Sequence, residues 1–212
     1  MILAAGRGER MRPLTDQLPK PLLLVRDKPL IVYHLEKLSR LGVKQVVINL
    51  AWLGERIRAA LGDGAQWGLS IRYSDESGEA LETGGGIFKA LPRLGAEPFL
   101  VVNADVFTDL DFGTLQIAPA ALAQLVLVAN PPHHPGGDFA LADGLVMEQG
   151  DPRWTYSGIG IYRPELFDGC GGGKFPLRRL LLRAIQARRL YGQVHAGLWY
   201  GVDTPERLAE LQ

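Results

Sequence analysis

Short apolar runs alternate with segments of helical periodicity through the first half of the chain. The apolar runs at 2–5, 43–50 and 70–74 read as strands. Between them, apolar residues recur every three or four positions from Asp27 to Gly42 and from Trp52 to Leu61, which predicts two amphipathic helices. This order of strands and helices is typical of a parallel sheet that is covered by helices on both faces.

A longer apolar run at 98–106 predicts a central strand, and Asn103 and Asp105 stand at its C-terminal end. Because strand side chains alternate, these two point to the same side. Beyond it the pattern is less regular. We expect strands at 123–130 and 155–162, a hairpin at 139–148 with its turn at Asp143-Gly144, a helix at 175–189, a late strand reaching Asp203, and a last helix from Thr204.

Composition narrows the class of protein. The 212 residues carry 23 Lys and Arg against 23 Asp and Glu, a formal net charge of zero that argues against nucleic-acid binding by bulk charge. The single cysteine, Cys170, excludes an internal disulfide and suits a reducing compartment. The start lacks a secretion signal, and the apolar stretch 118–129 is interrupted and too short to span a membrane. We therefore expect a soluble cytoplasmic protein without nucleic-acid or membrane partners.

The opening segment, MILAAGRGERMRPLT, combines a glycine turn with three arginines. A glycine turn after a strand exposes backbone N–H groups, and Arg7, Arg10 and Arg12 add positive charge. Together they predict a cradle for a polyanion, most simply a triphosphate. Lys20 follows between two prolines, which favour an extended, non-helical segment. That lysine is either a phosphate ligand held on a stiff frame or an ordinary surface lysine.

Two further features are candidates for ligand binding. In the segment 75–86, three glycines precede a helical run that we expect to begin at Ile87 and end at Leu94. They would allow a flat ligand to approach, with Glu82 and Thr83 as hydrogen-bonding groups; the alternative is a flexible loop. Asp105 either binds a metal beyond the carboxyl end of its strand or caps the following turn. His133 and His134 lack a third metal ligand nearby and read as solvated loop residues.

Two known glycine loops fail to match. A Walker A loop needs Gly-Lys before Ser or Thr, whereas this chain has Gly8-Glu9-Arg10, and a dinucleotide fold needs a third glycine where Met11 stands. The motifs GRGERMRPLT, PKPLLLV and NADV instead resemble the sugar-1-phosphate nucleotidyltransferase family. That resemblance covers the whole chain. It implies one Rossmann-like, three-layer α/β/α domain over 1–212 with a mostly parallel mixed central sheet, whose nucleotide half is about 1–106 and whose sugar half is about 107–212.

The resemblance also implies roles for particular residues. Gly6, Gly8, Glu9 and Arg10 would surround the triphosphate, with Arg10 on the leaving pyrophosphate. Lys20 would stabilise the charge that develops at the α-phosphate. The other implied contacts are Thr83 and Gly84 with the base; Asn103, Asp138 and Glu148 with the sugar; and Asp105 with Mg²⁺.

Within the family, LETGGGIFKALP, HHPGGDF and TYSGI resemble the members that transfer a uridylyl group from UTP to N-acetylmuramate 1-phosphate in peptidoglycan recycling. Two departures stand out. The family pattern Trp-x-Asp-x-Gly-Thr reads WYGVDT here, so Asp203 is the expected second metal ligand. A related cytidylyltransferase group that ends in GVDTPE uses that aspartate. The family's Glu-Lys-Pro lysine is also missing, and Arg153 is the nearest cation to that place.

Three alternatives remain open on the sequence. The chain could pair another nucleoside triphosphate with a hexose 1-phosphate. It could be a non-catalytic nucleotide-sugar sensor, because the change at Asp203 affects an expected metal ligand. A third reading is an NAD(P)-binding domain. In every case the sequence is compatible with a monomer or a small homo-oligomer.

Overall fold

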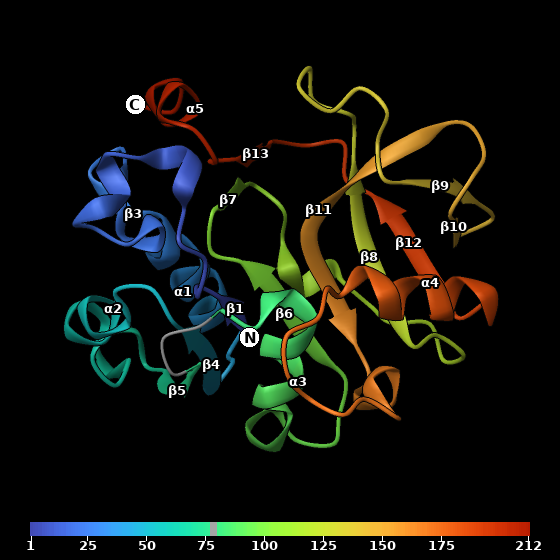
Figure 1. Ribbon diagram of the computed structural model, residues 1–212, viewed down its shortest axis with the longest axis horizontal. Coiled ribbons are helices and arrows are strands. Elements are labelled where there is room, and N and C mark those ends of the chain that lie inside the picture. Colours follow the sequence, from blue (N-terminus) through green and yellow to red (C-terminus); the bar gives the residue numbers. More distant parts are fainter. Residues whose placement is uncertain (77–79) are drawn as a thin grey trace.

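A computed structural model describes residues 1–76 and 80–212 (Figure 1). Ser77, Gly78 and Glu79 belong to the glycine-rich segment 75–86, so the prediction of a ligand loop there falls partly outside the described residues. None of the helices in the described part of the chain has the length and apolarity needed to cross a membrane.

Nine strands of the described chain form one mixed sheet in the order β5-β4-β1-β6-β11-β8-β12-β10-β9. The first four are parallel, whereas β11 runs antiparallel to both of its main neighbours, β6 and β8. The predicted mixed, mainly parallel sheet is thereby confirmed in its first half. The strand bounds are β1 Ile2–Leu3, β4 Gln45–Leu50, β5 Ser70–Asp75, β6 Phe99–Asn103, β8 Ala123–Val128, β9 Phe139–Ala142, β10 Leu145–Met147, β11 Arg153–Tyr162 and β12 Leu190–Val194.

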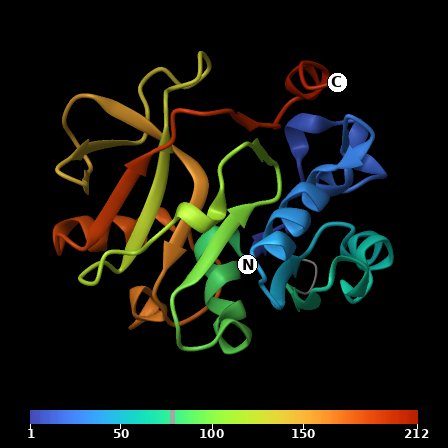
Figure 2. The ribbon, with the colours of Figure 1, turned by 180° about the vertical axis from the view of Figure 1, so that it is seen from behind.

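Helices cover both faces of this sheet, which gives the three-layer α/β/α arrangement. On β4, Val46 and Ile48 pack with α1 (Leu30–Arg40) and α2 (Gly54–Leu61), whereas Val47 belongs to the core under α3 (Glu82–Leu94) and α4 (Arg178–Gln186). Strand side chains alternate between faces, so one strand serves both cores. Figure 1 views the molecule from the side of α3 and α4, and Figure 2 from the side of α1.

Segments from the first and second halves of the chain meet beside the sheet. The predicted central strand 98–106 is interrupted by a turn at Ala104-Asp105, after which β7 (Val106–Thr108) pairs with β13 (Trp199–Gly201). A short helix, α5 (Pro205–Ala209), follows. A ribbon of β2 (Leu24–Val25) and β3 (Lys28–Pro29) lies near it, and a small apolar cluster joins these parts through Met11, Leu23, Val25, Leu30, Phe107, Val202 and Leu211.

Most of the predicted elements are found in the described residues. The hairpin turn is confirmed at Asp143 and Gly144, both of which have positive φ. Strand β12 was not predicted, because LYGQV lacks a clear alternation. Helix α3 begins at Glu82 rather than at Ile87, so the triple glycine lies inside the helix.

Candidate active site

The N-terminal loop is braced by its own side chains. Gly8 has φ 66°, and its carbonyl accepts a hydrogen bond from Thr15 Oγ1 at 2.7 Å. Arg7 stacks on Trp52, with its guanidinium 3.8 Å from the ring centre, and donates to Asp16 Oδ1 at 2.7 Å. That hydrogen bond is the main cause that lowers the pKa of Asp16. Arg7 therefore holds the loop together rather than standing ready for an anion.

Arg12 has the same partner as Arg7, with its Nε 2.9 Å from Asp16 Oδ1. Of the three arginines that the sequence placed around a polyanion, two thus neutralise one carboxylate inside the loop. Arg10 is different, because its side chain is 71% exposed while it pairs with Asp203. The loop's cation that reaches furthest into solvent is therefore the one that the family pattern assigns to the leaving pyrophosphate.

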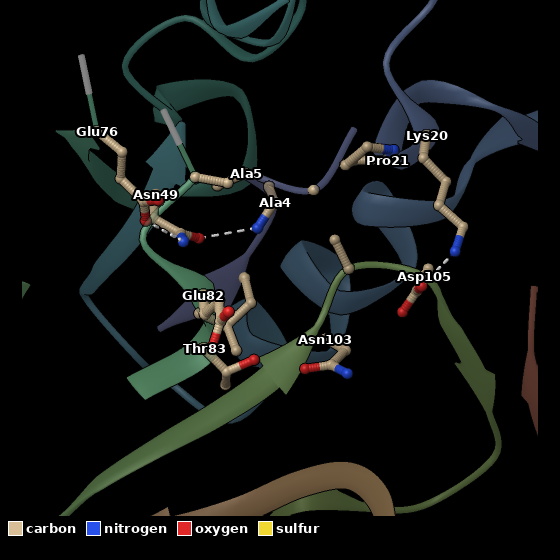
Figure 3. Close-up of a pocket in the computed structure, with 14 residues that line it drawn as sticks. Ala4, Ala5, Lys20, Pro21, Asn49, Glu76, Glu82, Thr83, Asn103 and Asp105 are labelled. Carbon is tan, nitrogen blue, oxygen red and sulfur yellow. Dashed lines mark hydrogen bonds and ion pairs between the residues drawn. The ribbon is translucent and has the colours of Figure 1, made fainter. Parts of the chain in front are cut away.

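Lys20 is not an ordinary surface lysine. Its side chain is only 12% exposed, and its ammonium forms an ion pair with the carboxylate of Asp105 (Figure 3). Pro19 is extended as predicted, but Lys20 itself begins a single 3₁₀ turn that ends at Leu22. The prediction of a non-helical segment is therefore wrong at Lys20–Leu22. The hydrogen bond from Leu23 N to Lys20 O closes the turn and outweighs the preference of a residue before proline for extended backbone.

Asp203 reaches the same corner through the β7–β13 ribbon. Val202 N donates to Asp105 O at 2.8 Å, which sets the two aspartates' backbones side by side. The Asp203 carboxylate lies 2.7 Å from Arg10 and 2.9 Å from Arg207, and its side chain is 13% exposed. Both aspartates are therefore held by cations at the end of β6.

A first cavity of about 210 Å³ opens at the carboxyl ends of β1, β4 and β6. A buried chain of hydrogen bonds forms one side of it (Figure 3). Ala4 N donates to Asn49 Oδ1 at 2.8 Å, and Asn49 Nδ2 donates to Glu76 Oε1 at 2.7 Å. The other carboxylate oxygen of Glu76 accepts from Leu81 N at 2.7 Å.

Sequence reasoning missed Asn49 and Glu76, although a signal was present. Asn49 is a polar residue near the C-terminal end of an apolar strand, as Asn103 is, and Glu76 directly follows the next strand. The carboxyl ends of parallel strands gather at one edge of a sheet, where ligands bind. Applying that rule to every strand, rather than only to 98–106, would have found both.

A second cavity, of about 450 Å³, lies between β6, β9, β11 and the start of α4. Asp138 faces it with its carboxylate fixed at both oxygens. Oδ2 accepts from Tyr156 N at 2.8 Å, and Oδ1 is 3.3 Å from His134 Nε2. The Tyr156 hydroxyl lies 2.6 Å from that of Tyr162, and burial raises the pKa of both phenols.

The two cavities share a wall formed by Glu82, Thr83 and Asn103. They therefore adjoin, with the first turn of α3 and the end of β6 between them. Of the predicted residues, the structure brings Gly6, Lys20, Thr83, Asn103 and Asp105 to the first cavity, and Thr83, Asn103 and Asp138 to the second. Six predicted residues are not among the described residues that line either cavity: Gly8, Glu9, Arg10, Gly84, Glu148 and Asp203.

The triple glycine allows helix α3 to pack closely against neighbouring segments of the protein. A Cβ on Gly84 would lie 2.5 Å from the Phe175 ring, and one on Gly85 would lie 2.2 Å from Gly173 O. At Gly86 it would meet Glu76 Oε1 at 2.6 Å. The interpretation that these glycines make room for a flat ligand is corrected accordingly, because all three are buried and α3 lies too close to its neighbours for side chains.

Arg153, the nearest cation to the missing family lysine, is committed to backbone carbonyls. Its guanidinium donates to Gly136 O and Glu148 O at 2.8 Å each, and to Asp138 O at 2.9 Å. It therefore anchors the loop that carries Asp138. Glu148 itself lies on the hairpin with its side chain 52% exposed and 3.6 Å from Arg178.

The two loop histidines make no metal site with their neighbours. His133 Nε2 is 3.1 Å from Arg207 Nη1, and His134 pairs with Asp138. Over residues 1–76 and 80–212, no group of three or more His, Cys, Asp or Glu side chains is arranged to hold a metal ion. The loop instead connects the second cavity to the cations around Asp203.

Two adjoining cavities lie at the carboxyl edge of the α/β sheet, where folds of this kind bind their ligands, and the Lys20–Asp105 ion pair lines the first of them. The family model described as nucleotidyl transferase matches residues 1–142. The chain is 52% identical over its full length to N-acetylmuramate alpha-1-phosphate uridylyltransferase of Neisseria meningitidis, covering 96% of that protein. The chain belongs to the nucleotidyl transferase family.

Other relatives agree with this assignment. The protein of the same name from Caulobacter vibrioides is 36% identical over 97% of this chain and 92% of its own length. Among solved structures, HddC of Yersinia pseudotuberculosis, complexed with GMP-PN, has a TM-score of 0.78 at 22% identity and covers 99% of this chain and 96% of its own. At that identity the likeness shows the fold alone.

Proposed function

We propose that the protein transfers a uridylyl group from UTP to N-acetylmuramate 1-phosphate, in peptidoglycan recycling. The observation that carries this proposal is the shared wall between the two cavities, with Lys20 and Asp105 lining the first. The names of the two relatives that match nearly the whole chain support the choice of substrates.

In this proposal the nucleotide occupies the first cavity, whose described lining residues all come from the half 1–106. The sugar occupies the second cavity, which residues of the half 107–212 line together with Glu82, Thr83 and Asn103. A phosphate oxygen of the sugar attacks the α-phosphorus of UTP, a P–O bond forms, and the bond to the leaving pyrophosphate breaks. Positioning and charge neutralisation do most of the work in such a transfer. Lys20 Nζ stabilises the negative charge that develops at the α-phosphate.

The remaining side chains bind and orient. Arg10 contacts the pyrophosphate, and the backbone of Gly6, Gly8 and Glu9 surrounds the triphosphate. Thr83 faces the base, and Gly84 supports it by letting α3 approach Phe175. Asn103 and Asp138 hold the sugar hydroxyls and N-acetyl group, and Glu148 acts at the outer edge of the sugar cavity.

We further propose that Asp105 and Asp203 hold Mg²⁺. The donor chemistry fits, because Mg²⁺ binds one or two carboxylates together with substrate phosphates and several waters. The two aspartates are adjacent along the β7–β13 ribbon. Each now forms an ion pair with a side-chain cation, Lys20 on Asp105 and Arg10 on Asp203, and a bound metal ion would replace that cation as the carboxylate's partner. When bound, the ion neutralises phosphate oxygens.

The test is a grid of nucleoside triphosphates (UTP, dTTP, GTP, ATP) against sugar 1-phosphates, scored by pyrophosphate release with and without Mg²⁺. We expect UTP with N-acetylmuramate 1-phosphate to be the best pair and chelation to abolish turnover. Another best pair would retain the reaction class and overturn the substrates. Nucleotide-sugar binding with no turnover by any pair would favour a sensor. The observation that favours this alternative is that two arginines already neutralise Asp203, the expected metal ligand.

We place this reaction in the cytoplasm, where nucleoside triphosphates are made and where a chain with one cysteine suits the reducing conditions. We also propose that the protein acts as a monomer or small homo-oligomer. Light scattering of the purified protein measures the latter directly.

A further inference from the structure

We propose that Arg178 binds the lactyl carboxylate of the sugar substrate and thereby selects muramate over amino sugars that lack this group. The inference rests on the proposed function. N-acetylmuramate 1-phosphate differs from N-acetylglucosamine 1-phosphate by a lactyl ether on O3, which carries a carboxylate. The proposal gives this carboxylate a cationic partner.

The charges around the second cavity point to Arg178. Among the described residues that line it, Glu82 and Asp138 are acidic and Arg178 is the one lysine or arginine. A carboxylate that leaves water needs a cation or several hydrogen-bond donors, because an unpaired buried charge is strongly unfavourable. In the proposed function the sugar phosphate faces Lys20, which lines the first cavity and not the second, so that lysine is not available to a group carried on O3.

The position of Arg178 suits a carboxylate. Its guanidinium carbon lies 5.3 Å from the centre of the Phe139 ring in a cation–π contact, and both residues line the cavity. The planar guanidinium carries paired N–H groups that match the two oxygens of a carboxylate. The contact to Glu148 is 3.6 Å long between half-exposed side chains, so it holds Arg178 only weakly against a ligand.

Helix stability does not explain an arginine at this place. Arg178 is the first residue of α4, and the first turn of that helix contains no acidic residue. Cations oppose the helix dipole at an N-terminus. The neighbouring Arg153 is occupied by three backbone carbonyls at 2.9 Å or less, so it is not free to bind a substrate.

The experiment measures pyrophosphate release with UTP and three sugar phosphates: N-acetylmuramate 1-phosphate, its lactyl amide, and N-acetylglucosamine 1-phosphate. In the R178A variant we expect KM for the muramate to rise about tenfold or more. KM for the amide and for the glucosamine should change less than about twofold, since neither carries the carboxylate. R183A, which removes an arginine from the same helix that does not line the cavity, is the matched control and should leave all three values unchanged.

A wild-type enzyme that uses no muramate phosphate would overturn the proposed function. A wild type that does use it, with R178A raising KM equally for all three sugars or for none, would overturn the role of Arg178 alone. R178K keeps the charge but not the planar fork, so we expect an intermediate KM for the muramate. An R178K variant whose KM for the glucosamine rises as much as its KM for the muramate would indicate damage to α4 and contradict the assignment.

Discussion

The carboxylate of Asp203 forms an ion pair with the guanidinium of Arg10 at 2.7 Å, and this pair connects the N-terminal glycine loop to the segment after β13. Arg207 holds the other oxygen of the same carboxylate at 2.9 Å. The aspartate is largely buried and Arg10 largely exposed, so the carboxylate is the fixed member of the pair. The position of the Arg10 guanidinium therefore depends on a residue that lies far from it in the sequence.

Replacing Asp203 by Asn should weaken the binding of Mg²⁺ and lower turnover. The amide keeps the size of the side chain but loses the charge that pairs with both arginines and that the proposed Mg²⁺ would need. We expect kcat to fall by roughly ten- to a hundredfold and the Mg²⁺ concentration for half activity to rise, measured by pyrophosphate release. The exposed Glu97→Gln variant is the control for loss of one carboxylate. Unchanged metal dependence with reduced kcat would mean that Asp203 only positions Arg10.

Replacing Lys20 by Met should abolish most of the turnover while leaving the fold intact. Methionine fills the space of the aliphatic stem but cannot stabilise charge at the α-phosphate. We expect kcat to drop by about two to three orders of magnitude, the usual effect of losing one transition-state charge contact. Lys44→Met, at an exposed position, serves as control. A drop caused by unfolding would show in the circular dichroism spectrum and would argue against a direct role.

The sequence predicted the site's cations and acids better than their partners. Lys20 and Asp105 were recognised as candidates because prolines and a strand end mark their positions. Their ion pair depends on the 3₁₀ turn at Lys20–Leu22 and the turn between β6 and β7, which no local pattern announces. Arg7 was expected near a polyanion, yet it contacts Trp52 and Asp16 instead. The contact with Trp52 joins residues far apart in the sequence, so no local pattern could predict it.

Replacing Gly86 by Ala should destabilise the protein, although alanine favours helices. A Cβ there would come within 2.6 Å of Glu76 Oε1 and 2.9 Å of Asn49 Nδ2. Overpacking of this kind costs about 1–3 kcal/mol, which exceeds the gain in helix propensity of about 1 kcal/mol. Gly171→Ala is the matched control, since its Cβ would meet no atom within 4 Å. Urea unfolding measures both; equal stability of the two variants would contradict this packing.

Acid should destabilise the protein partly through His34. Burial lowers the pKa of this histidine from 6.5 to about 4, so the folded protein keeps the ring neutral while the unfolded chain takes up a proton. The unfolded state binds more protons between these two values, and stability therefore falls as the pH drops from about 6.5 to 4. The slope from this group approaches about 1.4 kcal/mol per pH unit. In His34→Leu, unfolding followed in urea at pH 7, 6 and 5 should show a shallower decline; an identical slope would contradict it.

The layered sheet could be predicted from the sequence, because the spacing of apolar residues and the runs of β-branched residues depend directly on which side chains are buried. Val46, Val47 and Ile48 alternate between two cores as their positions require. The triple glycine at Gly84–Gly86 was harder to interpret, because a missing side chain fits either a ligand or a neighbouring segment. The deciding neighbours, Phe175 and Gly173, follow the helix by many residues and are brought to it by the fold.

The wall made by Glu82, Thr83 and Asn103 has a consequence for inhibition. A ligand that fills both cavities places its second half at a high effective concentration once the first half is bound. The proposed product, a UDP-sugar, is such a bivalent ligand. We expect such a product to compete with both substrates as it accumulates. An analogue that bridges the same wall with an uncleavable linker is therefore a starting point for a bisubstrate inhibitor.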